Sequence, residues 1–113
     1  MLLKDKHCLE SILQSIQKIK AYSQKYKSEK EFYNTTEYEA SMMNFIIISE
    51  MVEKLSDETK LSNTDVQWKS IKGFRNIATH NYFGLDAEEV WSIIQTRLPD
   101  LQTKIKRILS KLS

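Results

Sequence analysis

Four residues whose side chains could carry out chemistry together stand close in the sequence: Arg75, Asn76, His80 and Tyr82. A guanidinium group is always charged and suits phosphate oxygens, and an imidazole titrates near neutral pH and can move protons. Asn76 and His80 are four residues apart, so they share a face if this segment is helical. A purely structural interpretation is also open, in which Arg75 lies on a helix surface, His80 interacts with the dipole at a helix C-terminus and Tyr82 is a half-buried packing residue.

An arginine with a histidine, and no carboxylate-rich metal site beside them, indicates metal-independent cleavage of RNA. In that reaction a base removes the proton of a ribose 2′-hydroxyl, the oxygen attacks the adjacent phosphorus, and a cation stabilises the charge that develops. The reaction needs an acid as well as a base, but the cluster holds one histidine per chain. A symmetric dimer, the commonest oligomer, would bring two copies of the cluster together. We therefore expect a composite site formed by two protomers.

The composition argues against several other kinds of site and location. The single Cys8 cannot form a disulfide within the chain, and with only His7 and His80 the sequence lacks a zinc-type ligand set. We therefore expect no metal, no cofactor and a reducing cytoplasm. The longest uninterrupted apolar run, residues 45–48, is far shorter than the roughly 20 residues of a membrane-spanning helix. Residues 1–6 turn charged too early for a secretory signal, so we expect neither export nor a membrane anchor.

The net charge of +2 is small but unevenly distributed, because basic residues gather near both ends of the chain. The two groups would attract a polyanion if they converged in space, whereas each alone is typical of a solvated helix face. They comprise Lys18, Lys20, Lys25, Lys27 and Lys30 in one group and Lys104, Lys106, Arg107 and Lys111 in the other.

The elements that position the cluster should all be helices of a single domain, residues 1–113. The sequence has only 2 Gly and 1 Pro, too few turn residues for a sheet of many short strands. Apolar residues at three- and four-residue steps predict a first helix near residues 3–27 and a second from a capping box at Thr36 to about residue 55. The apolar stripe of the second helix widens at residues 45–48. This predicts burial on more than one side, either centrally in a bundle or against a partner chain.

The cluster itself falls at the end of a third predicted helix, which begins at a capping box on Thr64 and ends near His80. Gly84 then offers a permissive backbone position, and Asp86 is a suitable cap for a fresh helix. Pro99 interrupts the long apolar seam of the last segment, which predicts a kink or two abutting helices. The polar stretches 27–31 and 57–63 are expected to fray or to form connections.

The motif and its flanks resemble a known family, the HepT-like members of the HEPN superfamily, helical proteins paired with minimal nucleotidyltransferases. Arg75, four residues, His80, one residue and Tyr82 match the family pattern Arg-x4-His-x-Tyr, and Asn76 follows the arginine as is typical. Glu50 stands at the characteristic acidic position of the second helix. The resemblance extends over about residues 4–110, and further segments in the family's order and spacing are 43–50, 55–58, 82–86 and 98–101.

This resemblance implies an all-α, up-and-down bundle of four to five helices that forms a homodimer or a higher assembly and acts as a ribonuclease toxin. Arg75 and His80 would be the catalytic pair, with Asn76 and Glu50 supporting them; for Glu50 a simple interhelical ion pair is an equally open interpretation. A cognate nucleotidyltransferase antitoxin would neutralise the toxin by transferring AMP from ATP to Tyr82. Two other interpretations remain open: a non-catalytic helical subunit that presents substrate or nucleotide to a partner nucleotidyltransferase, and a bundle used only for assembly.

Overall fold

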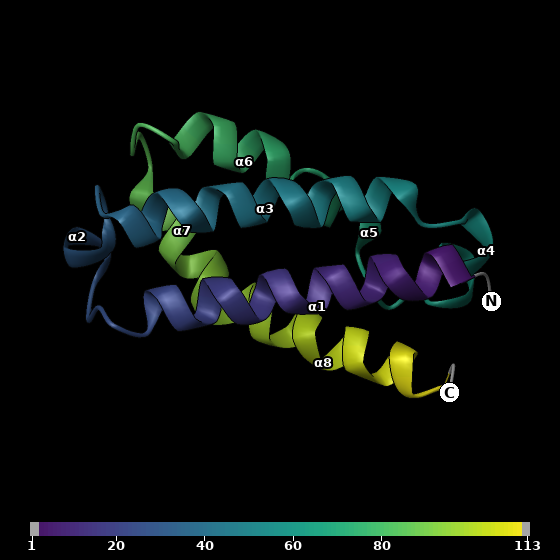
Figure 1. Ribbon diagram of the computed structural model, residues 1–113. Coiled ribbons are helices and arrows are strands. Elements are labelled where there is room, and N and C mark those ends of the chain that lie inside the picture. Colours follow the sequence, from purple (N-terminus) through teal and green to yellow (C-terminus); the bar gives the residue numbers. More distant parts are fainter. Residues whose placement is uncertain (1–2, 112–113) are drawn as a thin grey trace.

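The computed structural model of the protein describes residues 3–111, and over these residues the chain forms helices and no strand. Four longer helices, α1 (Leu3–Ser23), α3 (Thr36–Lys54), α6 (Phe74–Asn81) and α8 (Leu98–Ser110), make up an up-and-down bundle (Figure 1). The predicted all-α class is therefore confirmed. Shorter helical segments connect these four: α2 (Glu29–Phe32), α4 (Asp57–Ser62), α5 (Trp68–Lys72), α7 (Ala87–Ser92) and the π-helical turn η1 (Ile93–Arg97).

Helix α3 lies at the centre of the arrangement, as its wide apolar stripe predicted. It packs against α1 on one side and α6 on another, and α8 packs along α1 (Figure 1). Phe45 and Ile48 are completely buried, while Ile46 and Ile47 are half-buried. The core between α1, α3 and α8 consists of residues at helical spacing, among them Leu9, Ile12, Ile16, Ile19, Met42, Leu101, Ile105 and Ile108.

Two stretches predicted as connections are short helices, and in each case a serine begins the helix. The hydroxyl of Ser28 accepts a hydrogen bond from the amide of Glu31 at the start of α2, and that of Ser56 accepts from the amide of Thr59 at the start of α4. Helix α1 accordingly ends at Ser23 rather than at residue 27. Polar composition hid these helices because each buries only one side chain of its own.

Both predicted capping threonines are wrong in detail. Thr35, not Thr36, caps α3, since its hydroxyl accepts from the amide of Tyr38 at 3.0 Å and donates to the carbonyl of Phe32 at 2.7 Å. Thr64 caps no helix, because α5 starts four residues later without a side-chain cap. Adjacent threonines are chemically alike, so only the path of the incoming chain decides which one caps.

The predicted third helix, residues 64–80, is interrupted at Gly73, which separates α5 from α6. A Cβ atom at this position would lie 3.1 Å from the Ser70 carbonyl oxygen, a tight approach that glycine avoids. The hydroxyl of Ser49 on α3 donates a hydrogen bond to the carbonyl of Lys72, which the break leaves without a helical partner. This break sets the direction of α6, the helix that carries the candidate cluster.

The predictions for the last third of the chain are confirmed. Asp86 caps α7 by accepting a hydrogen bond from the amide of Glu89 at 3.1 Å, and Gly84 has a positive φ of 74°. Pro99 lies in the first turn of α8, directly after the π turn η1. Because proline has no amide hydrogen to donate to the preceding turn, the regular α-helical pattern gives way there to abutting helical segments.

Candidate active site

The candidate residues lie on and just after α6, and the amphipathic pattern of this helix decides which of them face solvent. Phe74, Ala78 and Asn81 recur at helical spacing and are buried, because α6 packs against α3. The opposite side of the helix is exposed. It carries Arg75, Asn76 and His80, and the exposed Tyr82 follows directly after the helix.

The structure brings the predicted supporting residue, Glu50, to the predicted catalytic arginine. The guanidinium of Arg75 forms an ion pair with the Glu50 carboxylate across the α3–α6 contact, with 53% of the Arg75 and 34% of the Glu50 side chain exposed. At such exposure an ion pair adds little to stability. The ion pair instead orients the Arg75 guanidinium. One carboxylate binds only part of this group, which has five N–H donors.

Arg75 is not joined directly to the other two motif side chains. Within residues 3–111 no hydrogen bond or ion pair links Arg75, His80 and Tyr82. His80 lies in the last turn of α6, as the structural interpretation also expects. The ring of Tyr82 is half exposed and packs edge-on against Phe83, with ring centroids 5.2 Å apart. A single chain therefore presents each of these groups to solvent rather than as a hydrogen-bonded cluster.

Asn81, between His80 and Tyr82, is completely buried and fixes the backbone of the motif. Its carbonyl accepts a hydrogen bond from the hydroxyl of Tyr38 at 2.7 Å. Its side-chain oxygen accepts from the amide of Asp86 at 2.7 Å, and its Nδ2 donates to Glu89 at 3.0 Å. Burial, with smaller contributions from nearby Tyr33 and Asp86, raises the pKa of Tyr38 to about 12, so this hydroxyl remains a donor. Sequence reasoning missed Asn81 and Tyr38, although the position of Asn81 inside the motif was a visible signal.

A second contact holds the loop that follows Tyr82. The hydroxyl of Tyr33 donates to the carbonyl of Phe83 at 3.1 Å, and the Tyr33 ring covers Gly84 so closely that a Cβ atom there would overlap it. Tyr33 belongs to the segment between α2 and α3, which lies far from Gly84 in the sequence. The loop is thus held at its start by the hydrogen bonds of Asn81 and in its middle by Tyr33.

Next to the motif the molecule exposes a patch of large apolar side chains. Met43 on α3 is 58% exposed and Phe83 is 77% exposed. A groove of about 340 Å³ runs between α3 and α6 beside them. We call this the α3–α6 apolar surface; it comprises Met43, Tyr82 and Phe83, with Met42, Ile46 and Ala78 in the groove. Apolar surface of this kind is typical of an interaction site.

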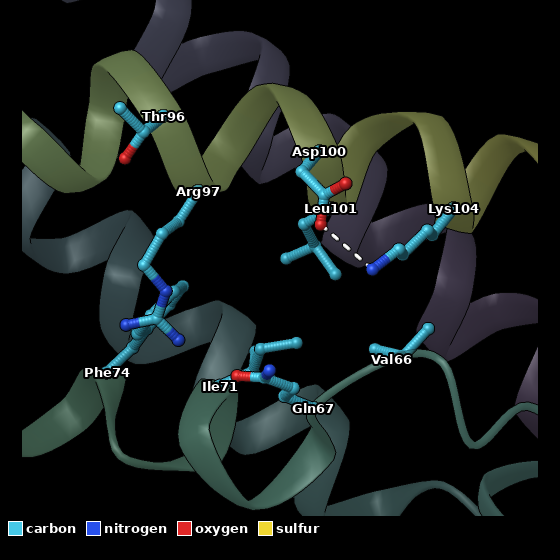
Figure 2. A pocket seen from close by; sticks show the side chains of 9 residues that line it. All are labelled: Val66, Gln67, Ile71, Phe74, Thr96, Arg97, Asp100, Leu101 and Lys104. Atoms are coloured by element: carbon cyan, nitrogen blue, oxygen red, sulfur yellow. Dashed lines mark ion pairs between the residues drawn. The ribbon is translucent and has the colours of Figure 1, made fainter.

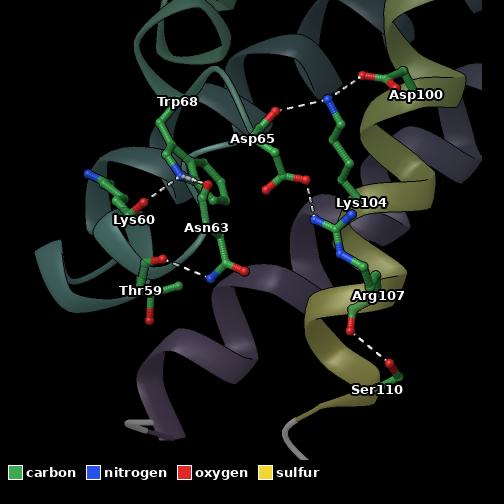
Figure 3. Close-up of polar contacts among 9 residues, drawn as sticks. All are labelled: Thr59, Lys60, Asn63, Asp65, Trp68, Asp100, Lys104, Arg107 and Ser110. Carbon is green, nitrogen blue, oxygen red and sulfur yellow. Dashed lines mark hydrogen bonds and ion pairs between the residues drawn. The ribbon is translucent and has the colours of Figure 1, made fainter.

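The basic residues near the two ends of the chain do not converge. Those at the end of α1 lie at the opposite end of the bundle from the end of α8 (Figure 1). In α8, Arg107 pairs with the Asp65 carboxylate, and Lys104 donates to the Asp65 carbonyl at 2.9 Å and pairs with Asp100 at 3.0 Å. Figure 3 shows that these contacts tie α8 to the loop before α5, where Trp68 Nε1 donates to the carbonyls of Lys60 and Asn63.

Other kinds of site are not evident in the described part of the chain. Between residues 3 and 111 the His, Cys, Asp and Glu side chains form no group of three or more that could hold a metal ion. No helix over the same residues has the length and apolar character needed to cross a membrane. Cys8 is buried, and burial first and the nearby Asp5 second raise its thiol pKa, as expected of a packing residue rather than a nucleophile.

Comparison with known proteins adds independent information. The sequence model of the family described as "Ribonuclease HepT-like" matches residues 12–108. A protein of Caldanaerobacter subterraneus named "Putative RNase" is 37% identical over 58% of this chain and 58% of its own length. A protein of Methanocaldococcus jannaschii named "Gamma-glutamylcyclotransferase and putative RNase" is 30% identical over 92% of this chain and 47% of its own length. A "Probable ribonuclease HepT" of Thermococcus cleftensis is 22% identical over 91% of this chain and 94% of its own length.

The chain thus spans about half the length of the first two of these relatives. No solved structure gives a significant match.

Proposed function

The chain belongs to the HepT-like ribonuclease family, and from this premise we propose that it is a metal-independent endoribonuclease in which Arg75 and His80 act together. The observation that carries the proposal is the placement of both side chains on the solvent face of α6, where a single RNA strand can reach them. The α3–α6 apolar surface lies beside them and supports a homodimer in which two copies of the pair face one substrate.

The proposed reaction follows from these groups. The His80 imidazole of one protomer accepts the proton of a ribose 2′-hydroxyl, and the freed oxygen forms a bond to the adjacent phosphorus. The bond from phosphorus to the 5′-oxygen breaks, and the second imidazole of the dimer gives that oxygen a proton. Arg75 stabilises the negative charge on the phosphoryl oxygens, with its orientation set by Glu50 and with Asn76 beside it. The products are a 2′,3′-cyclic phosphate and a 5′-hydroxyl.

The test is cleavage of a single-stranded RNA by the purified protein in EDTA. We expect cutting to persist, and to stop when the nucleotide on the 5′ side of the cut carries a 2′-deoxyribose. His80→Ala and Arg75→Ala should each abolish it and relieve growth arrest in cells that express the protein, whereas the exposed His7→Ala should behave as the parent does. Loss of cutting in EDTA would contradict metal independence. A folded dimer that cuts no RNA would favour the non-catalytic subunit instead.

We propose further that the protein is the toxin of a toxin–antitoxin pair and that a cognate nucleotidyltransferase modifies Tyr82. The phenol is half exposed, and its oxygen makes no hydrogen bond within residues 3–111. In the transfer the phenol oxygen bonds to the α-phosphorus of ATP, loses its proton and displaces pyrophosphate. The new phosphate and nucleoside would add negative charge and bulk beside the catalytic residues, and so exclude RNA.

The variant Tyr82→Phe separates catalysis from control, because it keeps the ring and removes the oxygen. We expect it to cut RNA and to remain toxic when the nucleotidyltransferase is present. Tyr22→Phe, a change of the same kind on α1, should be neutralised normally. Intact-protein mass spectrometry should detect one added AMP on the parent and on Tyr22→Phe but none on Tyr82→Phe; an AMP on Tyr82→Phe would contradict the assignment.

A further inference from the structure

A pocket of about 410 Å³ opens between α5 and α8, beside the start of α6. Its floor is apolar and includes Ile71 and the ring of Phe74, both buried. Polar side chains surround this floor: Gln67 on one wall and Arg97, Asp100 and Lys104 on the other (Figure 2). The mixed lining, with apolar side chains and polar groups around them, is typical of ligand sites.

Arg97 differs from the other two arginines of the chain in its surroundings. Arg75 pairs with Glu50 and Arg107 pairs with Asp65, but no carboxylate in the described residues lies within ion-pair distance of Arg97. Its guanidinium carbon lies 5.1 Å from the centroid of the Phe74 ring, and its Nη2 donates to the hydroxyl of Ser70. These contacts hold the group against the pocket wall and leave most of its five N–H donors free.

The one carboxylate in the pocket lining does not cancel this charge. Asp100 Oδ2 lies 3.0 Å from the ammonium group of Lys104, one turn further along α8. Lys104 therefore compensates the charge of Asp100, and because the charge of Arg97 is not compensated, this wall of the pocket has a net positive charge. A half-buried cation without a counter-ion favours an anionic ligand.

The pocket is connected to the proposed catalytic residues by positive side chains on α5. Ser70, the partner of Arg97, is flanked by Lys69, and Lys69 and Lys72 line a second hollow together with Arg75 and Asn76. The only acidic side chain lining that hollow is Glu53, whose carboxylate is 3.9 Å from Lys72, with both side chains more than half exposed. This arrangement gives the phosphate backbone of an RNA strand a positively charged path from Arg75 over α5 to Arg97.

The π-helical turn η1 ends at Arg97. Such turns add a residue to the helical repeat and frequently occur at functional sites. A regular α-helix through residues 93–97 would give the side chain at 97 a different direction, so the turn helps to set the side of the helix from which Arg97 reaches Ser70 and Phe74.

We propose that the pocket between α5 and α8 is an RNA subsite, in which Arg97 binds a backbone phosphate further along the strand from the one that is cleaved. The attached nucleoside would lie in the pocket, with Gln67 at its edge. This inference rests on the proposed ribonuclease function and adds to it a residue for substrate affinity that is remote from the reacting bonds.

The test measures binding of a fluorescently labelled single-stranded RNA to a cleavage-deficient His80→Ala protein over a range of salt concentrations. Adding Arg97→Gln should weaken binding roughly tenfold, the loss expected for one charge-assisted contact. It should also reduce the slope of log affinity against log salt by about 0.7, the value for one phosphate of a single strand. Arg97→Lys keeps the charge and should retain the slope. Arg107→Gln, which removes a paired arginine from α8, should change neither quantity.

A kinetic measurement with active protein complements the binding test. Arg97→Gln should raise KM for a long RNA and leave kcat unchanged, because the contact is equally strong before and during the reaction. For a dinucleotide, which has no further phosphate, it should change neither constant.

Unchanged affinity and salt slope in Arg97→Gln would overturn the subsite while leaving the ribonuclease proposal intact. If Arg97→Gln proved unstable, Arg97→Met, which keeps an apolar stem against Phe74 and removes the charge, would take its place, and unchanged affinity and salt slope in that variant would overturn the subsite equally. A parent protein that neither binds nor cuts RNA would instead overturn the proposed function itself.

Discussion

At the residue scale, the motif combines a rigid backbone with exposed side chains. Asn81 is buried and makes hydrogen bonds with Tyr38, Gly84, Asp86 and Glu89, while its neighbours His80 and Tyr82 on either side are exposed. Under the proposed function these side chains approach a phosphate or accept an adenylyl group, so they have to reach solvent, while their Cα positions have to be fixed for the geometry of reaction. The buried asparagine meets the second need without hindering the first.

The contact of Glu50 with Arg75 gives a first prediction. Glu50→Gln keeps the shape but removes the charge that orients the guanidinium. We expect kcat for RNA cleavage to fall about tenfold, since one charge-assisted contact contributes roughly 1.5 kcal/mol. Stability to urea should change by less than about 1 kcal/mol, because the pair is partly exposed. Glu53→Gln, one turn along the same helix, serves as the control and should change cleavage far less. Unchanged kcat in Glu50→Gln would mean that the ion pair is a surface contact without a role in catalysis.

Gly84 gives a second prediction at this scale. Its φ of 74° disfavours any residue with a Cβ atom, and the Tyr33 ring occupies the space where that atom would lie. Gly84→Ala should therefore lower the free energy of unfolding by about 2 kcal/mol or more, the sum of a backbone and a packing cost. Combining it with Tyr33→Ala removes the overlap but not the backbone cost, so the double variant should lose less than the two single losses added together. Strict additivity in urea titrations would show that the ring and the glycine do not interact.

At the element scale, the long helices could be predicted from the sequence and the short ones could not. The apolar stripes of α1, α3 and α8 each include several buried residues at regular spacing, so the periodic pattern is long enough to be recognised in the sequence. Helices α2 and α4 each bury one residue of their own. Their positions depend on contacts with distant parts of the chain, which composition does not record.

The candidate site shows the same division. Arg75, Asn76, His80 and Tyr82 were visible because their types and spacing form a local pattern, and the Glu50 partner came from family resemblance. Tyr38, Tyr33 and Arg97 act through contacts over 27 to 50 residues of sequence. Nothing in one sequence states which residues meet over such separations, so these three could be found only in the fold.

Helix α4 offers a prediction about pH, because a residue of α1 holds its start. The buried Asp5 carboxylate accepts hydrogen bonds from the Ser56 amide at 3.0 Å, the Ser56 hydroxyl at 2.5 Å and the Thr59 hydroxyl at 2.6 Å. Burial alone would raise the Asp5 pKa, but these bonds outweigh it and lower the pKa below its ordinary 3.8. The contact therefore stabilises the fold fully above the unfolded pKa and loses its contribution as the pH falls through the folded value.

The measurement is urea denaturation of the parent and Asp5→Asn between pH 7 and pH 2. At pH 7 we expect Asp5→Asn to be less stable by about 2 kcal/mol, since a neutral amide replaces a charged acceptor of three bonds. The difference should shrink below about pH 4, where the carboxylate in the unfolded chain becomes protonated. A constant difference over the whole range would mean that the charge of Asp5 is not what holds α4.

At the scale of the whole molecule, the proposed dimer would link the fold to the proposed chemistry. The α3–α6 apolar surface flanks the motif, so a two-fold axis through this surface would place two copies of His80 on the same side of the assembly. The central position of α3 contributes to this, because a helix already covered by α1 and α6 still has Met43 exposed and Ile46 half-buried. One surface would thus supply both association and the second catalytic group.

Phe83→Glu tests this link directly. The side chain is 77% exposed, so its replacement should leave the stability of the monomer within about 0.5 kcal/mol of the parent. In a dimer it would be buried, and the loss of an aromatic contact together with burial of a charge should weaken association at least about 100-fold, or roughly 2.7 kcal/mol. Sedimentation equilibrium should then report monomer at concentrations where the parent is a dimer, and cleavage should rise with the square of protein concentration.

Leu61→Glu alters a side chain that is 75% exposed on α4, away from the motif, and should change neither association nor cleavage. If Phe83→Glu stayed dimeric and fully active while Leu61→Glu dissociated, the interface would lie at the α4 end, and the two motifs would have to act independently, each with a single imidazole.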